Sequence, residues 1–118
     1  MDVLAKLYPK TLTESSEAFL LIRVRNTQKG YKWFEALVKL PEGLSFSAHF
    51  NLRKGKIRLG ILKRGEYVEK ATKFFASERG NGEIKIMVYA YDKDGVVAER
   101  KEVVLKANVF PKEEEIIV

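Results

Sequence analysis

Apolar and polar residues alternate along most of the chain, and this period of two residues predicts β-strands. In the segment 18–25, for example, Leu20, Ile22 and Val24 fall on one face, and Arg23 and Arg25 fall on the other. Strands are predicted over 3–8, 18–25, 34–40, 46–52, 57–61, 67–76, 83–91 and 96–109, the last with a bulge near 100–101. The expected inward residues include Phe34, Ala36, Val38 and Leu40; Phe46, Ala48, Phe50 and Leu52; Ile57, Leu59 and Ile61; and Ile84, Ile86, Val88 and Ala90.

Glycine, proline and asparagine separate these segments at regular intervals. Asp94-Gly95, between two alternating runs, is the strongest hairpin signal in the sequence. Pro41 lacks the amide donor that a strand needs, and the side chain of Asn26 is expected to bond to nearby backbone where its strand leaves the sheet. Gly43 and Gly65 are expected to adopt positive φ in turns. Regularly spaced short strands of this kind predict a β-sandwich or a β-barrel.

From about residue 8 to residue 109, the order of these residues resembles immunoglobulin-like domains of the CARDB and NPCBM-associated type. The resemblance is carried by Ile22-Arg23-Val24-Arg25-Asn26-Thr27, Leu40-Pro41-Glu42-Gly43-Leu44, Leu59-Gly60-Ile61-Leu62 with Gly65-Glu66, and Gly82-Glu83-Ile84-Lys85-Ile86 with Asp92-Lys93-Asp94-Gly95. Arg64 stands where the family often has proline. The resemblance implies an all-β, immunoglobulin-like (fibronectin type III-like) Greek-key β-sandwich of about seven strands. It also implies an interaction or spacer module with no catalytic residues.

The length and composition predict one domain with its own core. A chain of 118 residues suits a single domain, here expected over 1–110 with a tail over 111–118. The sequence has no cysteine, which excludes disulfides and fits a reducing compartment. Residues 1–9 do not resemble a secretory signal and no segment is apolar enough to span a membrane, so a cytoplasmic location is expected. Abundant Lys and Glu with a single Gln resemble the composition of a thermophile's protein.

Candidate catalytic and metal-binding residues are few, and each has a simpler structural explanation. His49 is the only histidine, and Ser47 on the same predicted strand would stand roughly 6–7 Å away, beyond hydrogen-bond reach. Asp92-Lys93-Asp94-Gly95 resembles part of a calcium loop, but Val103 occupies the place of the required glutamate. No phosphate-binding or nucleophile motif is present in the sequence. We therefore expect no enzyme activity, no metal site and no cofactor.

The charge pattern supplies the main functional candidate. The chain has 22 Lys and Arg against 16 Asp and Glu, a net charge of +6. The basic segment comprises Arg53, Lys54, Lys56, Arg58, Lys63 and Arg64, and a predicted loop holds Lys29, Tyr31, Lys32, Trp33 and Phe34. One interpretation is a nucleic-acid or anion-binding surface, on which aromatic rings stack with bases and lysines neutralise phosphates. The other is that Trp33 and Phe34 anchor the core while the lysines solvate turns.

The tail ends in three acidic residues followed by Ile116, Ile117 and Val118. It either frays or adds as a strand to a sheet edge, which would make a homodimer if the edge belongs to a second copy. The leading prediction is a non-catalytic module for protein–protein interaction or scaffolding, with another protein as partner. The alternative is a nucleic-acid-binding domain that uses the basic segment and the aromatic loop.

Overall fold

The computed structural model describes residues 1–112, and this part of the chain contains nine β-strands and no helix. The strands are β1 (Asp2–Tyr8), β2 (Leu12–Thr13), β3 (Ser16–Arg25), β4 (Lys32–Lys39), β5 (Leu44–Ser45), β6 (Lys54–Leu62), β7 (Tyr67–Ala76), β8 (Gly80–Tyr91) and β9 (Val97–Phe110). Two of them, β2 and β5, have only two residues each. Among the described residues, no helix exists that could cross a membrane.

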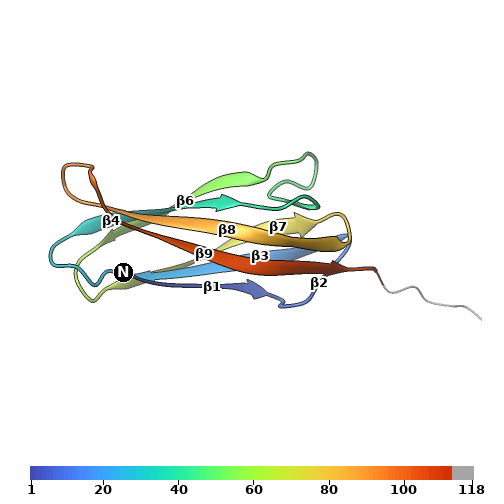
Figure 1. Ribbon diagram of the computed structural model, residues 1–118, viewed down its shortest axis with the longest axis horizontal. Coiled ribbons are helices and arrows are strands. Elements are labelled where there is room, and N and C mark those ends of the chain that lie inside the picture. The colour runs from blue at the N-terminus through green and yellow to red at the C-terminus, as the bar shows by residue number, and fades with distance from the viewer. Residues whose placement is uncertain (113–118) are drawn as a thin grey trace, which may run out of the picture.

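The strands form two sheets that pack against each other, so the predicted all-β sandwich is confirmed at this level. One sheet has four strands in the order β1-β3-β7-β5, and the other has five in the order β2-β9-β8-β4-β6. All neighbouring strands are antiparallel except β2 and β9, which are parallel. Figure 1 shows the long strands running along the longest axis, with the β8–β9 turn and the β3–β4 loop at the same end.

The core lies between the sheets and is filled by the residues that the alternation placed inward. Leu20, Ile22 and Val24 of β3 have no exposed surface, and Phe34 of β4 is 1% exposed. Phe74 of β7 is fully buried as well. The inward predictions are confirmed for Ala36, Val38, Leu40, Ile84, Ile86, Val88 and Ala90. Burial of this apolar surface is the main favourable contribution to folding.

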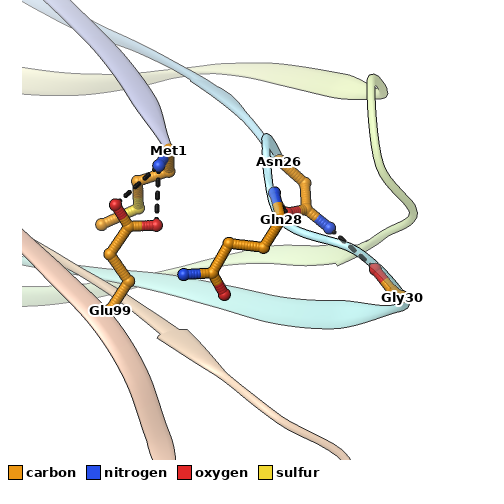
Figure 2. Close-up of polar contacts among 5 residues, drawn as sticks. All are labelled: Met1, Asn26, Gln28, Gly30 and Glu99. Carbon is orange, nitrogen blue, oxygen red and sulfur yellow. Dashed lines mark hydrogen bonds and ion pairs between the residues drawn. The ribbon is translucent and has the colours of Figure 1, made fainter.

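The loop at the end of β3 is fixed by Asn26, whose side chain is 1% exposed. Its Nδ2 donates to the carbonyl oxygen of Gly30 at 3.1 Å, and its Oδ1 accepts from the amide of Gln28 at 2.9 Å (Figure 2). The same Nδ2 also donates to the carbonyl oxygen of Leu62 at 2.9 Å. The backbone role predicted for Asn26 is therefore confirmed. Figure 2 also shows the terminal amine of Met1 held by the carboxylate of Glu99.

The predicted turns are present where the sequence placed them. Gly43 and Gly65 have φ of +89° and +87°, in the left-handed region that glycine favours. The hairpin between β8 and β9 turns at Gly95, with φ of +77°. The carboxylate of Asp92 accepts hydrogen bonds from the amides of Asp94 and Val96. This carboxylate thus holds the turn, in agreement with the hairpin interpretation.

The strand predicted over 46–52 is wrong. Residues 46–53 form a loop between β5 and β6, and Phe50 and Leu52 are exposed. The loop is organised by Ser45, whose hydroxyl donates to the carbonyl of Phe50 at 2.7 Å and accepts from the amide of Leu52 at 2.9 Å. These local bonds give the backbone partners that an extended strand would have needed from a neighbouring strand.

Two strands contain bulges that shift the predicted alternation. In β6, Arg58 pairs with Glu35, and the next pair joins Gly60 to Phe34. Leu59 is therefore an extra residue with no pairing partner in β4. Ile61, predicted inward, therefore points outward and is 69% exposed. In β9 the register shifts between the pairs Ala90–Glu99 and Tyr91–Val97. That irregularity falls at residue 98 rather than at the predicted 100–101.

Candidate binding face

The outward side chains of the five-stranded sheet form one continuous surface, which we call the basic face. They belong to β4, β6, β8 and β9, and the register places them opposite one another across the strands. Lysine and arginine outnumber carboxylates on this face, seven to three. Its charged residues are Lys39, Lys54, Lys56, Arg58, Lys85, Arg100, Lys106, Glu35, Glu83 and Glu102.

Aromatic and aliphatic side chains lie at one end and along the middle of the basic face. Trp33 is 37% exposed and stacks on Tyr91, with ring centroids 4.0 Å apart and planes inclined by 15°. Tyr89 lies next along β8, with its ring 6.1 Å from that of Tyr91. The β6 bulge brings Ile61 beside Trp33. Leu37, which is 39% exposed, continues the apolar surface between the cations.

Glu35 lies nearly buried among these residues. It is 7% exposed, and its Oε1 accepts a hydrogen bond from the hydroxyl of Tyr91 at 2.6 Å. Its Oε2 lies 3.7 Å from Nζ of Lys56. The hydrogen bond to Glu35, followed by desolvation, raises the pKa of Tyr91 to about 12. Tyr91 therefore keeps its proton at neutral pH and donates a hydrogen bond that positions the carboxylate of Glu35.

Three lysines stand in a single row across three strands of the basic face. Lys39 of β4 pairs directly with Lys54 of β6 on one side and with Lys85 of β8 on the other. Within residues 1–112, none of the three forms an ion pair. Like charges directly opposite each other on a sheet are destabilising, so this lysine row lowers the stability of the isolated domain.

A groove lies beside the lysine row, with a volume of about 460 Å³. Leu37 and Met87 provide its apolar surface, and Glu102 of β9 lies at its other side. This volume falls within the range of roughly 300–1,000 Å³ that is usual for small-ligand sites. Lys39, Lys54, Lys56 and Lys85 also line this lysine groove.

The structure divides the site residues predicted from the sequence among three places. Trp33, Lys54, Lys56 and Arg58 lie on the basic face. Arg53 belongs to the loop that precedes β6, whereas the turn after β6 holds Lys63 and Arg64. Lys29 and Tyr31 lie in the β3–β4 loop, and Lys32 is the first residue of β4. Residues 53–64 therefore do not form one patch, because a strand of nine residues separates its two ends.

The predicted aromatic loop is also only partly correct. Trp33 and Phe34 belong to β4, where Phe34 points into the core and Trp33 points outward. Sequence reasoning missed Lys39, Lys85, Arg100, Tyr89 and Tyr91 as members of the same surface. Each occupies an outward position of a predicted strand, but only the strand order β9-β8-β4-β6 brings them together.

The candidates for chemistry are not assembled into a site. His49 is exposed as predicted, but it lies in the loop 46–53 and not on a strand. Its backbone amide donates to the hydroxyl of Ser47 at 3.2 Å, so this hydroxyl caps the loop backbone. Among residues 1–112 no group of three or more His, Asp or Glu side chains is placed to hold a metal ion. The tail residues Ile116, Ile117 and Val118 lie outside the described residues.

Comparison with known proteins does not assign this chain to a family. A scan against models of protein families gave no match, and a search of curated proteins gave none either.

Proposed function

We propose that this chain is a non-catalytic binding module with an immunoglobulin-like Greek-key fold, and that it contacts another protein through the basic face. The strand order supports this fold, because β1, β3 and β7 lie in one sheet while β4, β6, β8 and β9 lie in the other. Consecutive strands such as β3 and β4 thus cross between the sheets, as in immunoglobulin-like sandwiches. We also propose that the chain is related to domains of the CARDB and NPCBM-associated type.

The observation that carries the proposal is an apolar strip beside a group of cations, most of which form no ion pair within residues 1–112. Trp33, Leu37 and Ile61 expose apolar surface on an open sheet face. Lys56 pairs with Leu37, and Arg58 lies in the cross-strand row next to that of Trp33 and Ile61. An apolar centre with a polar, charged rim is the usual arrangement of a protein interface. The lysine row also supports the proposal. Its like charges destabilise the free domain, and a negatively charged partner would neutralise them.

A pair of matched variants tests this proposal. Leu37→Glu places a charge in the apolar strip, whereas Leu4→Glu makes the same change on β1, at a residue 53% exposed on the opposite side of the sandwich. Immobilised wild-type protein and Leu4→Glu are expected to capture the same protein from cell extract, and Leu37→Glu is expected to lose it. Equal capture by both variants, with both folded by circular dichroism, would refute the basic face as the contact surface.

Nucleic-acid binding is the second candidate, favoured by the aromatic end of the face. Trp33, Tyr89 and Tyr91 lie in two adjacent cross-strand rows, and Arg58 and Arg100 flank Glu35 and Tyr89 in one of them. Aromatic rings beside arginine suit single-stranded nucleic acid, whose bases stack and whose phosphates bind cations. The carboxylate of Glu35 reduces the positive charge at this end, which favours the protein partner over this alternative.

Titration with oligonucleotides separates the two candidates. Non-specific nucleic-acid binders reach dissociation constants of about 0.1 mM or tighter, and their affinity falls steeply with salt. If this surface binds nucleic acid, Trp33→Ala and Arg58→Ala weaken binding, whereas Arg23→Ala on the other sheet does not. A dissociation constant weaker than about 1 mM at low salt rules the alternative out.

A further inference from the structure

We infer that the lysine groove binds residues 113–118 of a second copy of this chain; the inference rests on the proposed function, since it names one occupant of the basic face. The groove offers two kinds of contact in a small space. Leu37 and Met87 form an apolar surface, and four lysines, Lys39, Lys54, Lys56 and Lys85, stand around it. A suitable occupant carries several carboxylates directly beside aliphatic side chains.

The segment 113–118 has this composition. It reads Glu113-Glu114-Glu115-Ile116-Ile117-Val118, three carboxylates followed by three β-branched aliphatic residues. The carboxylates would neutralise the lysine row, in which Lys39 has a lysine on each side. The aliphatic residues would cover the exposed part of Leu37, which is 39% accessible in the isolated chain.

The occupant must come from another copy, because the segment cannot reach the groove of its own chain. Met87 pairs with Glu102, and β9 continues for eight more residues to Phe110, about 26 Å further along the sheet. The backbone amide of Lys112 donates to Glu14 at 3.0 Å, which holds the chain beyond that end of β9. Six residues span at most about 20–22 Å when fully extended. Residues 113–118 therefore fall short of Leu37 and Met87.

Binding between copies predicts self-association of moderate strength. The donor segment and the acceptor groove lie on different parts of the molecule, so two copies exchange segments reciprocally or many copies link head to tail. Exposed ion pairs contribute little each, and association of two copies costs translational and rotational freedom. We expect a dissociation constant on the order of 0.1 mM, weakening as salt screens the lysines.

A labelled peptide with the sequence of residues 112–118 tests the inference in fluorescence anisotropy. The peptide is expected to saturate the full-length protein, and replacing its three glutamates with glutamine or its three aliphatic residues with serine is expected to weaken binding at least tenfold. On the protein, Lys39→Glu is expected to weaken binding at least tenfold, whereas Lys6→Glu on the outer face of the other sheet changes it less than twofold. Absence of saturable binding, or equal effects of the two substitutions, overturns the inference.

Sedimentation velocity gives an independent measurement. The mean mass of the full-length chain is expected to rise with concentration, and deletion of 113–118 is expected to abolish the rise. Equal association of the deleted chain overturns the inference. If the peptide does not bind but Leu37→Glu still loses a captured protein, this inference fails and the proposed function stands. If the peptide binds but Leu4→Glu and Leu37→Glu capture the same proteins, the inference stands and the proposed contact with another protein fails.

Discussion

The two outer faces of the sandwich use the same alternating pattern but arrange their charges differently. On the four-stranded sheet, Nε of Arg23 lies 3.4 Å from Glu69, and Nζ of Lys73 lies 3.3 Å from Glu17. On the basic face, the only ion pair within residues 1–112 joins Lys56 to Glu35. The four-stranded face therefore pairs Arg23 and Lys73 with carboxylates, whereas the basic face leaves most of its cations without a partner in the described chain.

The exposed aromatic residues differ in the same way. On the four-stranded sheet, the guanidinium of Arg23 lies 4.4 Å from the ring centroid of Tyr67, and Nζ of Lys73 lies 6.0 Å from that of Phe19. Each cation lies over the face of a ring and forms a cation–π interaction with it. On the basic face, Trp33 instead stacks on Tyr91, and Ile61 and Leu37 have open surface beside them. The two faces thus differ in what pairs with their aromatic rings, which is a cation on the four-stranded sheet and another ring on the basic face.

The largest predicted effect tests the framework that both faces share. Asn26 connects the end of β3 in one sheet to Leu62 of β6 in the other. Asn26→Ala removes the buried hydrogen bond to the carbonyl of Leu62 and the two partly buried bonds to Gly30 and Gln28, and we expect a loss of about 2–4 kcal/mol in the free energy of unfolding. Urea denaturation measures it, with Asn51→Ala in the exposed loop as the control. Equal urea midpoints for the two variants would show that the hydrogen bonds of Asn26 do not contribute to the free energy of unfolding.

The second prediction compares the carboxylates of the two faces. Glu35→Ala removes the acceptor of the Tyr91 hydroxyl and the carboxylate that pairs with Lys56, so we expect a loss of about 1–3 kcal/mol. Glu17→Ala removes an exposed partner of Lys73, and about 0.5 kcal/mol or less is expected. Both are measured by urea denaturation. If Glu17→Ala lowers the free energy of unfolding as much as Glu35→Ala does, the carboxylates of the two faces contribute equally to stability.

The third prediction has opposite signs on the two faces. Lys39→Glu replaces the central charge of the lysine row and should stabilise the fold by about 0.5 kcal/mol at low salt. Lys73→Glu places a like charge beside Glu17 and should destabilise it by a similar amount. Thermal denaturation at low and high salt checks both, because salt should reduce each effect. Destabilisation by Lys39→Glu at low salt would show that repulsion among the three lysines does not lower the stability of the fold.

The smallest prediction concerns alkaline titration. Because the pKa of Tyr91 is raised from 10.0 to about 12, Tyr91 should give a late step in an alkaline titration. A raised pKa contributes stability that is complete below the unfolded value and is lost as pH rises from 10 toward 12. Ultraviolet absorbance of tyrosinate follows the ionisation. In Glu35→Gln the late step should shift down toward the ordinary tyrosine pKa; an unchanged titration would mean that Glu35 is not its cause.

The core was predictable from the sequence, because inward residues of long strands need only local alternation. Leu20, Ile22 and Val24 follow it without interruption, and their burial matches the prediction. The segment 46–52 alternates equally well, yet it has no neighbouring strand, and the hydroxyl of Ser45 supplies its hydrogen bonds. Alternation identifies residues able to form a strand but does not show whether a partner strand exists.

The basic face was only partly predictable, because it is assembled by strand order. Lys54 and Lys56 lie close in sequence and were identified together. Lys39 and Lys85 are 46 residues apart, and only the pairing of β4 with β8 places them side by side. Lys63, although close to Lys56 in sequence, lies in the turn after β6. Linear proximity is therefore a poor guide to a surface that crosses several strands.

The bulge at Leu59 and Gly60 has a consequence for how such a surface changes in evolution. Gly60 has φ of +114°, and the extra residue shifts the alternation of β6 by half a period, which places Ile61 beside Trp33. Loss of a single codon here would remove the bulge and restore strict alternation, and it would leave Ile61 opposite Trp33 with its side chain outward. One in-frame deletion would thus make the strand regular while keeping the apolar strip.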